Sequence, residues 1–113
     1  MELVGLVISN DNASQIINLA KKGDWDEIFI VSNNESLSID KKYNLIKINP
    51  ENRLVDMKAD ILKKLRGKIK GTEVALSIAS GTGKEHMAII SALLSIPVGI
   101  RFVAFTKDGI VHL

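Results

Sequence analysis

The chain alternates short apolar runs with stretches in which apolar residues recur at helical spacing. Continuous apolar runs of this length predict strands that are buried on both faces. They cover residues 3–8, 27–31, 45–48, 74–79 and 98–105. The turn Lys107-Asp108-Gly109 then predicts a hairpin into a short final strand at residues 110–113.

Three helices are predicted between these strands. The first has apolar residues at positions 13, 16, 17 and 20; we expect Asn12 to cap it, with Gln15 three residues later, and Gly23 to end it. The second is amphipathic, with apolar positions 54, 57, 61 and 65, lysines on its other side and Gly67 as its terminator. The third, residues 84–95, is unusually apolar.

Strands that alternate with helices need crossover connections, so the sheet should be mostly parallel with helices on both faces. The sequence therefore predicts an α/β protein, a Rossmann-like doubly wound sheet with a C-terminal hairpin. In such sheets, ligands bind at the carboxyl ends of the strands where the strand order reverses. Here that crevice should lie between the first and fourth strands.

Composition limits the number of domains and the kinds of partner to be expected. With 113 residues, 46% hydrophobic and 25% charged, the chain is expected to form one folded domain, residues 1–113. A net charge of +2 is too small to indicate duplex DNA binding. The lack of cysteine and of a signal-like or membrane-spanning segment favours a cytoplasmic protein. Two distant histidines make no metal site, and no cofactor is predicted.

Two polar turns flank the expected crevice. They follow the first and fourth strands, and their candidate ligand-binding residues are Ser9, Asn10, Asp11, Asn12, Ser80, Gly81, Thr82, Gly83, Lys84 and His86.

The turn at residues 80–84 has the chemistry of an anion site. Gly81 and Gly83 let the backbone turn sharply and expose its amides. The following helix adds unpaired N–H groups and the positive end of its dipole, and Lys84 adds a full charge. The turn is therefore predicted to hold an anionic, phosphate-bearing ligand.

Two familiar phosphate-binding motifs do not match the residues of this turn. A P-loop needs glycine at position 78 and Ser or Thr at position 85, where this chain has Ile78 and Glu85. A dinucleotide fingerprint needs a third glycine where His86 stands, and it belongs after the first strand. ATP hydrolysis and NAD binding are both disfavoured.

The two turns, residues 9–12 and 80–87, resemble those of the CARF (CRISPR-associated Rossmann-fold) domains. That family has a polar turn after its first strand and a Gly-Gly-Thr-Lys-like turn after its fourth; here the second turn reads Ser-Gly-Thr-Gly-Lys. The resemblance covers nearly the whole chain in element order. It implies a homodimer whose paired crevices bind cyclic oligoadenylate, the messenger of type III CRISPR defence, with the apolar third helix as dimer surface.

Some CARF proteins are ring nucleases that cleave this messenger without metal, through attack by a ribose 2′-hydroxyl on the adjacent phosphate. By this resemblance Lys84 and Ser9 are the candidate catalytic residues, with Asn10 as the alternative to Ser9, and His86 is a candidate acid or base if it faces the ligand. Three hypotheses stay open: a non-catalytic sensor, a ring nuclease, and a protein-interaction subunit whose glycine turn is structural.

The same residues also have simpler, purely structural interpretations. Lys84 can be a solvated lysine, His86 a surface residue, and residues 9–11 ordinary turn formers. The cationic run at residues 58–70 lacks aromatics and is interpreted as the solvated side of the second helix. Trp25 and Tyr43 are expected to pack at the sheet margin.

Overall fold

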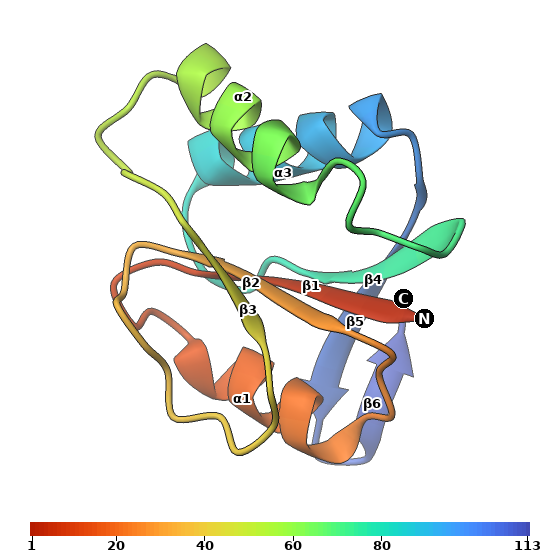
Figure 1. Cartoon of the computed structure of the whole chain (residues 1–113). Coiled ribbons are helices and arrows are strands. Elements are labelled where there is room, and N and C mark those ends of the chain that lie inside the picture. Colours follow the sequence, from red (N-terminus) through yellow and green to blue (C-terminus); the bar gives the residue numbers. More distant parts are fainter.

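The computed structural model describes all residues, 1–113, as one six-stranded sheet with helices on both faces (Figure 1). Its elements run in the order β1 (Glu2–Val7), α1 (Ala13–Lys22), β2 (Ile28–Ser32), β3 (Asn44–Lys47), α2 (Leu54–Leu65), β4 (Glu73–Ser77), α3 (Gly83–Ser95), β5 (Gly99–Thr106) and β6 (Gly109–His112). All nine predicted elements are present, with ends shifted by one or two residues.

The strand order is β3-β2-β1-β4-β5-β6, and only the last pair is antiparallel. β1 pairs with β2 through Leu3 and Ile28 and with β4 through Leu3 and Ala75. The chain therefore reverses its direction of travel across the sheet at β1, and the β1–β4 boundary is the switch point. The Rossmann-like α/β prediction, including the hairpin at Gly109 (φ 105°), is confirmed.

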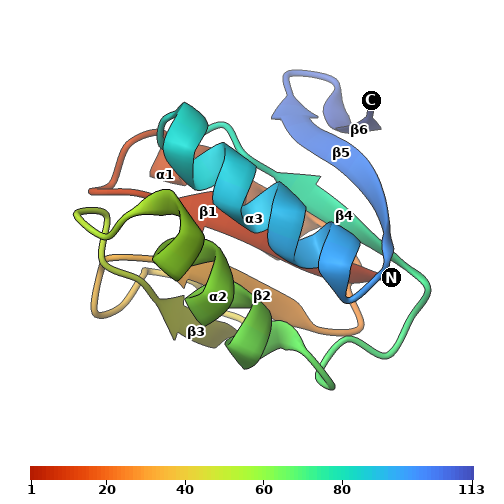
Figure 2. The same ribbon diagram turned by 90° about the horizontal axis from the view of Figure 1, so that it is seen from above.

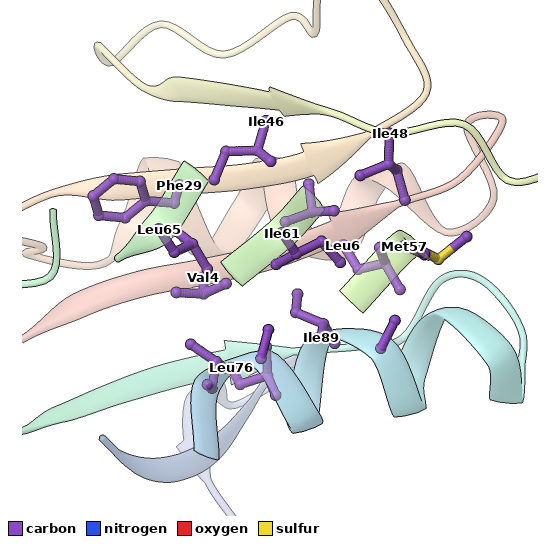
Figure 3. Packing of buried hydrophobic residues seen from close by; sticks show 14 of the residues in the cluster. Val4, Leu6, Phe29, Ile46, Ile48, Met57, Ile61, Leu65, Leu76 and Ile89 are labelled. Atoms are coloured by element: carbon purple, nitrogen blue, oxygen red, sulfur yellow. The ribbon is translucent and has the colours of Figure 1, made fainter. Parts of the chain in front are cut away.

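Each face of the sheet has its own core, because successive strand side chains point to opposite faces. α2 and α3 lie side by side over one face (Figure 2), where side chains such as Leu6 and Leu76 meet Ile61 and Ile89 (Figure 3). α1 covers the other face, and the β5–β6 hairpin lies on the same side as α1 (Figure 1). The second and third predicted helices thus share one layer.

The start of α1 differs from the prediction. Asn12 stands at the N-cap position, but its side chain does not cap the helix and instead donates to the carbonyl of Ala79, at 2.8 Å. The reason is its left-handed backbone (φ 51°), which is not the extended conformation that a capping Asn adopts. Gly23 ends α1 as predicted, and Gly67 (φ 82°) lies just beyond the end of α2.

Gln15 has a role that the capping prediction missed. Pairing between β4 and β5 stops at Leu76 and Phe102, although β5 continues to Thr106. Beyond that point the Gln15 side chain accepts a hydrogen bond from the Phe105 amide (3.0 Å) and donates one to the Phe105 carbonyl (2.8 Å). The Gln15 side-chain amide therefore takes the place of the backbone hydrogen-bond partner that β4 no longer supplies. It also links α1 to the hairpin.

The sheet margin holds the aromatic residues expected there. Trp25 packs against the α1-side core and donates from its indole to the Leu19 carbonyl at 2.7 Å, and Tyr43 packs against the same core. None of the three helices has the length and apolar character that crossing a membrane requires.

Gly5 lies in β1 directly under α1, and this close approach generates a prediction. A Cβ at Gly5 would stand 2.1 Å from Cδ1 and 2.5 Å from Cγ1 of Ile16, which is itself only 1% exposed. We expect Gly5→Ala to lower the free energy of unfolding by about 1–3 kcal/mol, the usual cost of overpacking a core. Urea denaturation followed by circular dichroism measures this change.

The matched control is Gly83→Ala, where an added Cβ meets nothing within 4 Å. We expect its midpoint to stay close to that of the native chain. Equal stability of the Gly5→Ala variant would contradict the close approach of α1 to β1.

Candidate functional site

The two turns singled out in the sequence meet at the switch point. Ile8, which follows β1, donates its amide to the Ser80 hydroxyl at 2.8 Å, and Ser80 is only 1% exposed. The Asn12 side chain reaches across to the Ala79 carbonyl at 2.8 Å. These bonds hold the loop after β1 against the loop after β4, as the topology requires.

The loop after β1 adopts an unusual backbone. Ser9 (φ 51°), Asn10 (φ 63°) and Asn12 (φ 51°) all lie in the left-handed region, and none of them is glycine. Asparagine visits this region more readily than other residues, and serine does so at a cost of roughly 1–2 kcal/mol. Such strain persists only where the surroundings impose it, and it is concentrated at functional sites.

The surroundings that impose this backbone come from the loop after β2. Asn33 accepts from the Ser9 amide (2.8 Å) and donates to the Ser9 hydroxyl (3.0 Å), so both of its polar atoms are used. Asn34 donates to the Asn10 side chain at 2.7 Å. A third loop, after β2, therefore belongs to the site and holds Ser9 and Asn10 in place.

The N-terminus of α3 is partly satisfied by the protein's own carboxylates. Thr82 and Glu85 form a capping box: the Glu85 carboxylate, only 4% exposed, accepts from the Thr82 amide (2.8 Å) and from the Thr82 hydroxyl (3.0 Å). The exposed Asp11 accepts from the Gly81 amide at a long 3.4 Å. Two of the amides expected to face an anion are thus already paired.

Two other amides of the turn have no such partner. The backbone N–H groups of Gly83 and Lys84 make no hydrogen bond within the chain. Gly83 is exposed, and nothing lies within 4 Å of the position that its Cβ would take. Unpaired amides at the positive end of a helix attract negative charge, so this open corner is the part of the turn that can receive an anion.

The Lys84 ammonium lies elsewhere. It donates to the carbonyls of Pro50 (2.5 Å) and Asn52 (3.0 Å), in the loop between β3 and α2. No hydrogen bond joins it to Ser9, the other candidate catalytic residue, whose hydroxyl accepts from Asn33. In this structure Lys84 joins α3 to the start of α2, and its role towards a ligand stays a prediction.

His86 also points back into its own turn. Its Nε2 lies 2.7 Å from the Ser80 carbonyl, an acceptor, so this nitrogen carries the proton. The contact braces the turn from inside, and Nδ1 makes no hydrogen bond within the chain. Its predicted part as acid or base stays untested.

Sequence reasoning missed three contributors to the site. The spacing Thr82-x-x-Glu85 is the capping-box signature and could have identified Glu85. Asn33 and Asn34 follow a strand next to β1, so the rule that selected the other two turns applied to them as well. No sequence signal points to the contact between Lys84 and the loop at Pro50 and Asn52.

Nowhere in the structure do three or more histidine, cysteine, aspartate or glutamate side chains gather as a metal site would require. Comparison with known proteins gives no match, either to a protein-family model or to a curated protein sequence. The site is therefore interpreted from its own geometry.

The bond between Ile8 and Ser80 generates a prediction. Replacing Ser80 with Ala leaves the partly buried Ile8 amide without a partner, and we expect a loss of roughly 1–3 kcal/mol in unfolding free energy. Urea denaturation measures it. Ser36→Ala, an exposed serine with no side-chain hydrogen bond, is the control and should leave the midpoint unchanged. Equal midpoints for both variants would contradict a structural bond at Ser80.

Proposed function

We propose that the chain binds a phosphate-bearing ligand in the crevice between β1 and β4, and that this ligand is a cyclic oligoadenylate of type III CRISPR signalling. The unpartnered amides of Gly83 and Lys84, opening on free space beside the strained loop at Ser9 and Asn10, carry the proposal. The anionic part rests on these amides, and the cyclic oligoadenylate part rests on the resemblance of the two turns to CARF domains.

A homodimer completes the proposed site. Met87 and Leu94 on the outer side of α3 are 58% and 59% exposed, although both are large apolar side chains. Phe102 on β5, 37% exposed, adds to the apolar surface. A second copy that covers α3 would bring two identical crevices under one two-fold axis, an arrangement that suits a ring of phosphates.

Binding needs only what the crevice already has, whereas cleavage needs more. Stabilising a phosphorane would require the Lys84 ammonium to leave Pro50 and Asn52, or a different cation to take its place. A structural role for the turn is the competing hypothesis, and the pairing of Glu85 and Asp11 with its amides favours it. One experiment separates these three cases.

The first test blocks the open corner of the turn. Gly83 is exposed and an added Cβ there meets nothing within 4 Å, so a leucine side chain can be accommodated beside the free amides. We expect Gly83→Leu to weaken binding of cyclic oligoadenylate by on the order of tenfold or more, measured by calorimetry in EDTA. Thr72→Leu adds the same side chain on an exposed loop before β4 and should bind like the native chain.

Liquid chromatography of the same mixtures shows the fate of the ring. Intact bound ring supports a sensor, and linear products support a ring nuclease. No binding by the native chain, or equal binding by Gly83→Leu, refutes the proposed site.

The second test concerns Lys84 itself. If its ammonium moves onto the ligand, Lys84→Ala should weaken binding of cyclic oligoadenylate by about tenfold, as expected for loss of a charge-assisted contact. Lys22→Ala, which removes an exposed lysine at the end of α1, is the charge-matched control. Unchanged binding and turnover in Lys84→Ala would restrict this lysine to its contact with Pro50 and Asn52.

A further inference from the structure

We propose that the outer side of α2 binds an acidic, amphipathic helical segment of a different protein. The surface consists of an apolar stripe, Val55, Ala59 and Leu62, together with the cations Lys63 and Arg66. It is separate from the crevice between β1 and β4, and the inference does not depend on the proposed ligand.

The stripe is a second apolar side on a helix that has already buried its first. Met57, Ile61 and Leu65 are fully buried against the sheet. Val55, by contrast, is 76% exposed and Ala59 is exposed, while Leu62 is half-buried, packing partly against the sheet core and presenting the rest of its side chain to the hollow. Because Val55, Ala59 and Leu62 are spaced four and three residues apart, they lie along one side of α2. The exposed apolar surface of Val55 and Ala59 is therefore continuous with the outer edge of Leu62.

The stripe and the cations share one hollow. Ala59 and Leu62 line a shallow depression of about 430 Å³ together with Lys63 and Arg66. An occupant of this hollow would therefore contact apolar and cationic groups at once.

These cations have no partner within the chain. Lys63 and Arg66 form no ion pair, while Asp56, the exposed acid on the same helix, is taken by Arg53 at 3.3 Å. Residues 58–70 hold six lysines and arginines and a single acid, Asp60. Favourable contact with the helix dipole accounts for cations in the last turn of α2, but not for the run beyond it nor for the apolar stripe.

Charge and shape together select the kind of partner. An amphipathic helix places apolar side chains in a groove and flanks them with charges, and here the flanking charges must be acidic. No helix of a second copy fits, since α1 has no acid, α2 has more cations than acids, and the one acid of α3 is the buried Glu85. The stripe is too narrow for a membrane surface, and a nucleic acid backbone would leave it uncovered.

The test is a selection of random 16-residue peptides on the full-length chain. We expect the enriched peptides to combine Asp or Glu with large apolar residues at helical spacing, and to shift the backbone amide resonances of residues 55–66. Lys63→Glu with Arg66→Glu should weaken a selected peptide by about tenfold or more. Lys21→Glu with Lys22→Glu, the matched change at the last turn of α1, should alter it by less than about twofold.

Circular dichroism verifies that both double variants are folded. Val55→Ser, at a largely exposed position, tests whether the apolar stripe contributes to peptide binding, because it changes no charge. Enrichment of neutral or basic peptides, or equal loss in both double variants, overturns the proposal. Duplex RNA and anionic vesicles are tested as competitors. If either one binds the same residues and abolishes peptide binding, the surface belongs to that ligand and the proposal is overturned.

Discussion

The parallel pairing of β1 with β4 is the constraint on which the rest of this structure depends. It places strands that are far apart in sequence next to each other, and it sends α1 to one face and α2 with α3 to the other. It also brings the loop after each strand to the same edge, where the buried Ser80 hydroxyl takes the Ile8 amide. The candidate site is a product of this pairing, because neither loop has a complete set of polar contacts alone.

The polar groups of the crevice are largely engaged with one another. Asn33 fixes Ser9, Glu85 caps α3, and Lys84 is bound to two carbonyls of the loop before α2. What remains open is small: the Gly83 and Lys84 amides and the exposed side chains of the loop after β1. Most polar groups of the crevice are therefore engaged before any ligand arrives, and a ligand of the proposed kind would be recognised by shape and by a few free donors.

Much of this fold could be predicted because its signals are local. Apolar runs gave the strands, the helical spacing at Met57, Ile61 and Leu65 gave α2, and the alternation of elements implied the parallel sheet. The details of the site depend on contacts between distant segments, which periodicity does not encode. Asn12 was expected to cap α1, but its left-handed backbone turns the side chain towards Ala79. Lys84 was assigned from its place beside Gly83, whereas its long side chain reaches carbonyls 32 and 34 residues away. The chemistry of a flexible side chain is set by whatever lies within its reach.

The carboxylates at the start of α3 have a consequence for selectivity. Asp11 and Glu85 place two carboxylates at the turn and already accept from the Gly81 and Thr82 amides, so an approaching anion finds only the Gly83 and Lys84 amides free. A small, singly bound anion gains little by displacing them or by sitting beside them. A large ligand that makes many contacts at once can offset the repulsion with interactions made elsewhere. On the proposed function, the turn would therefore favour a ligand with several phosphates over free phosphate or a single nucleotide.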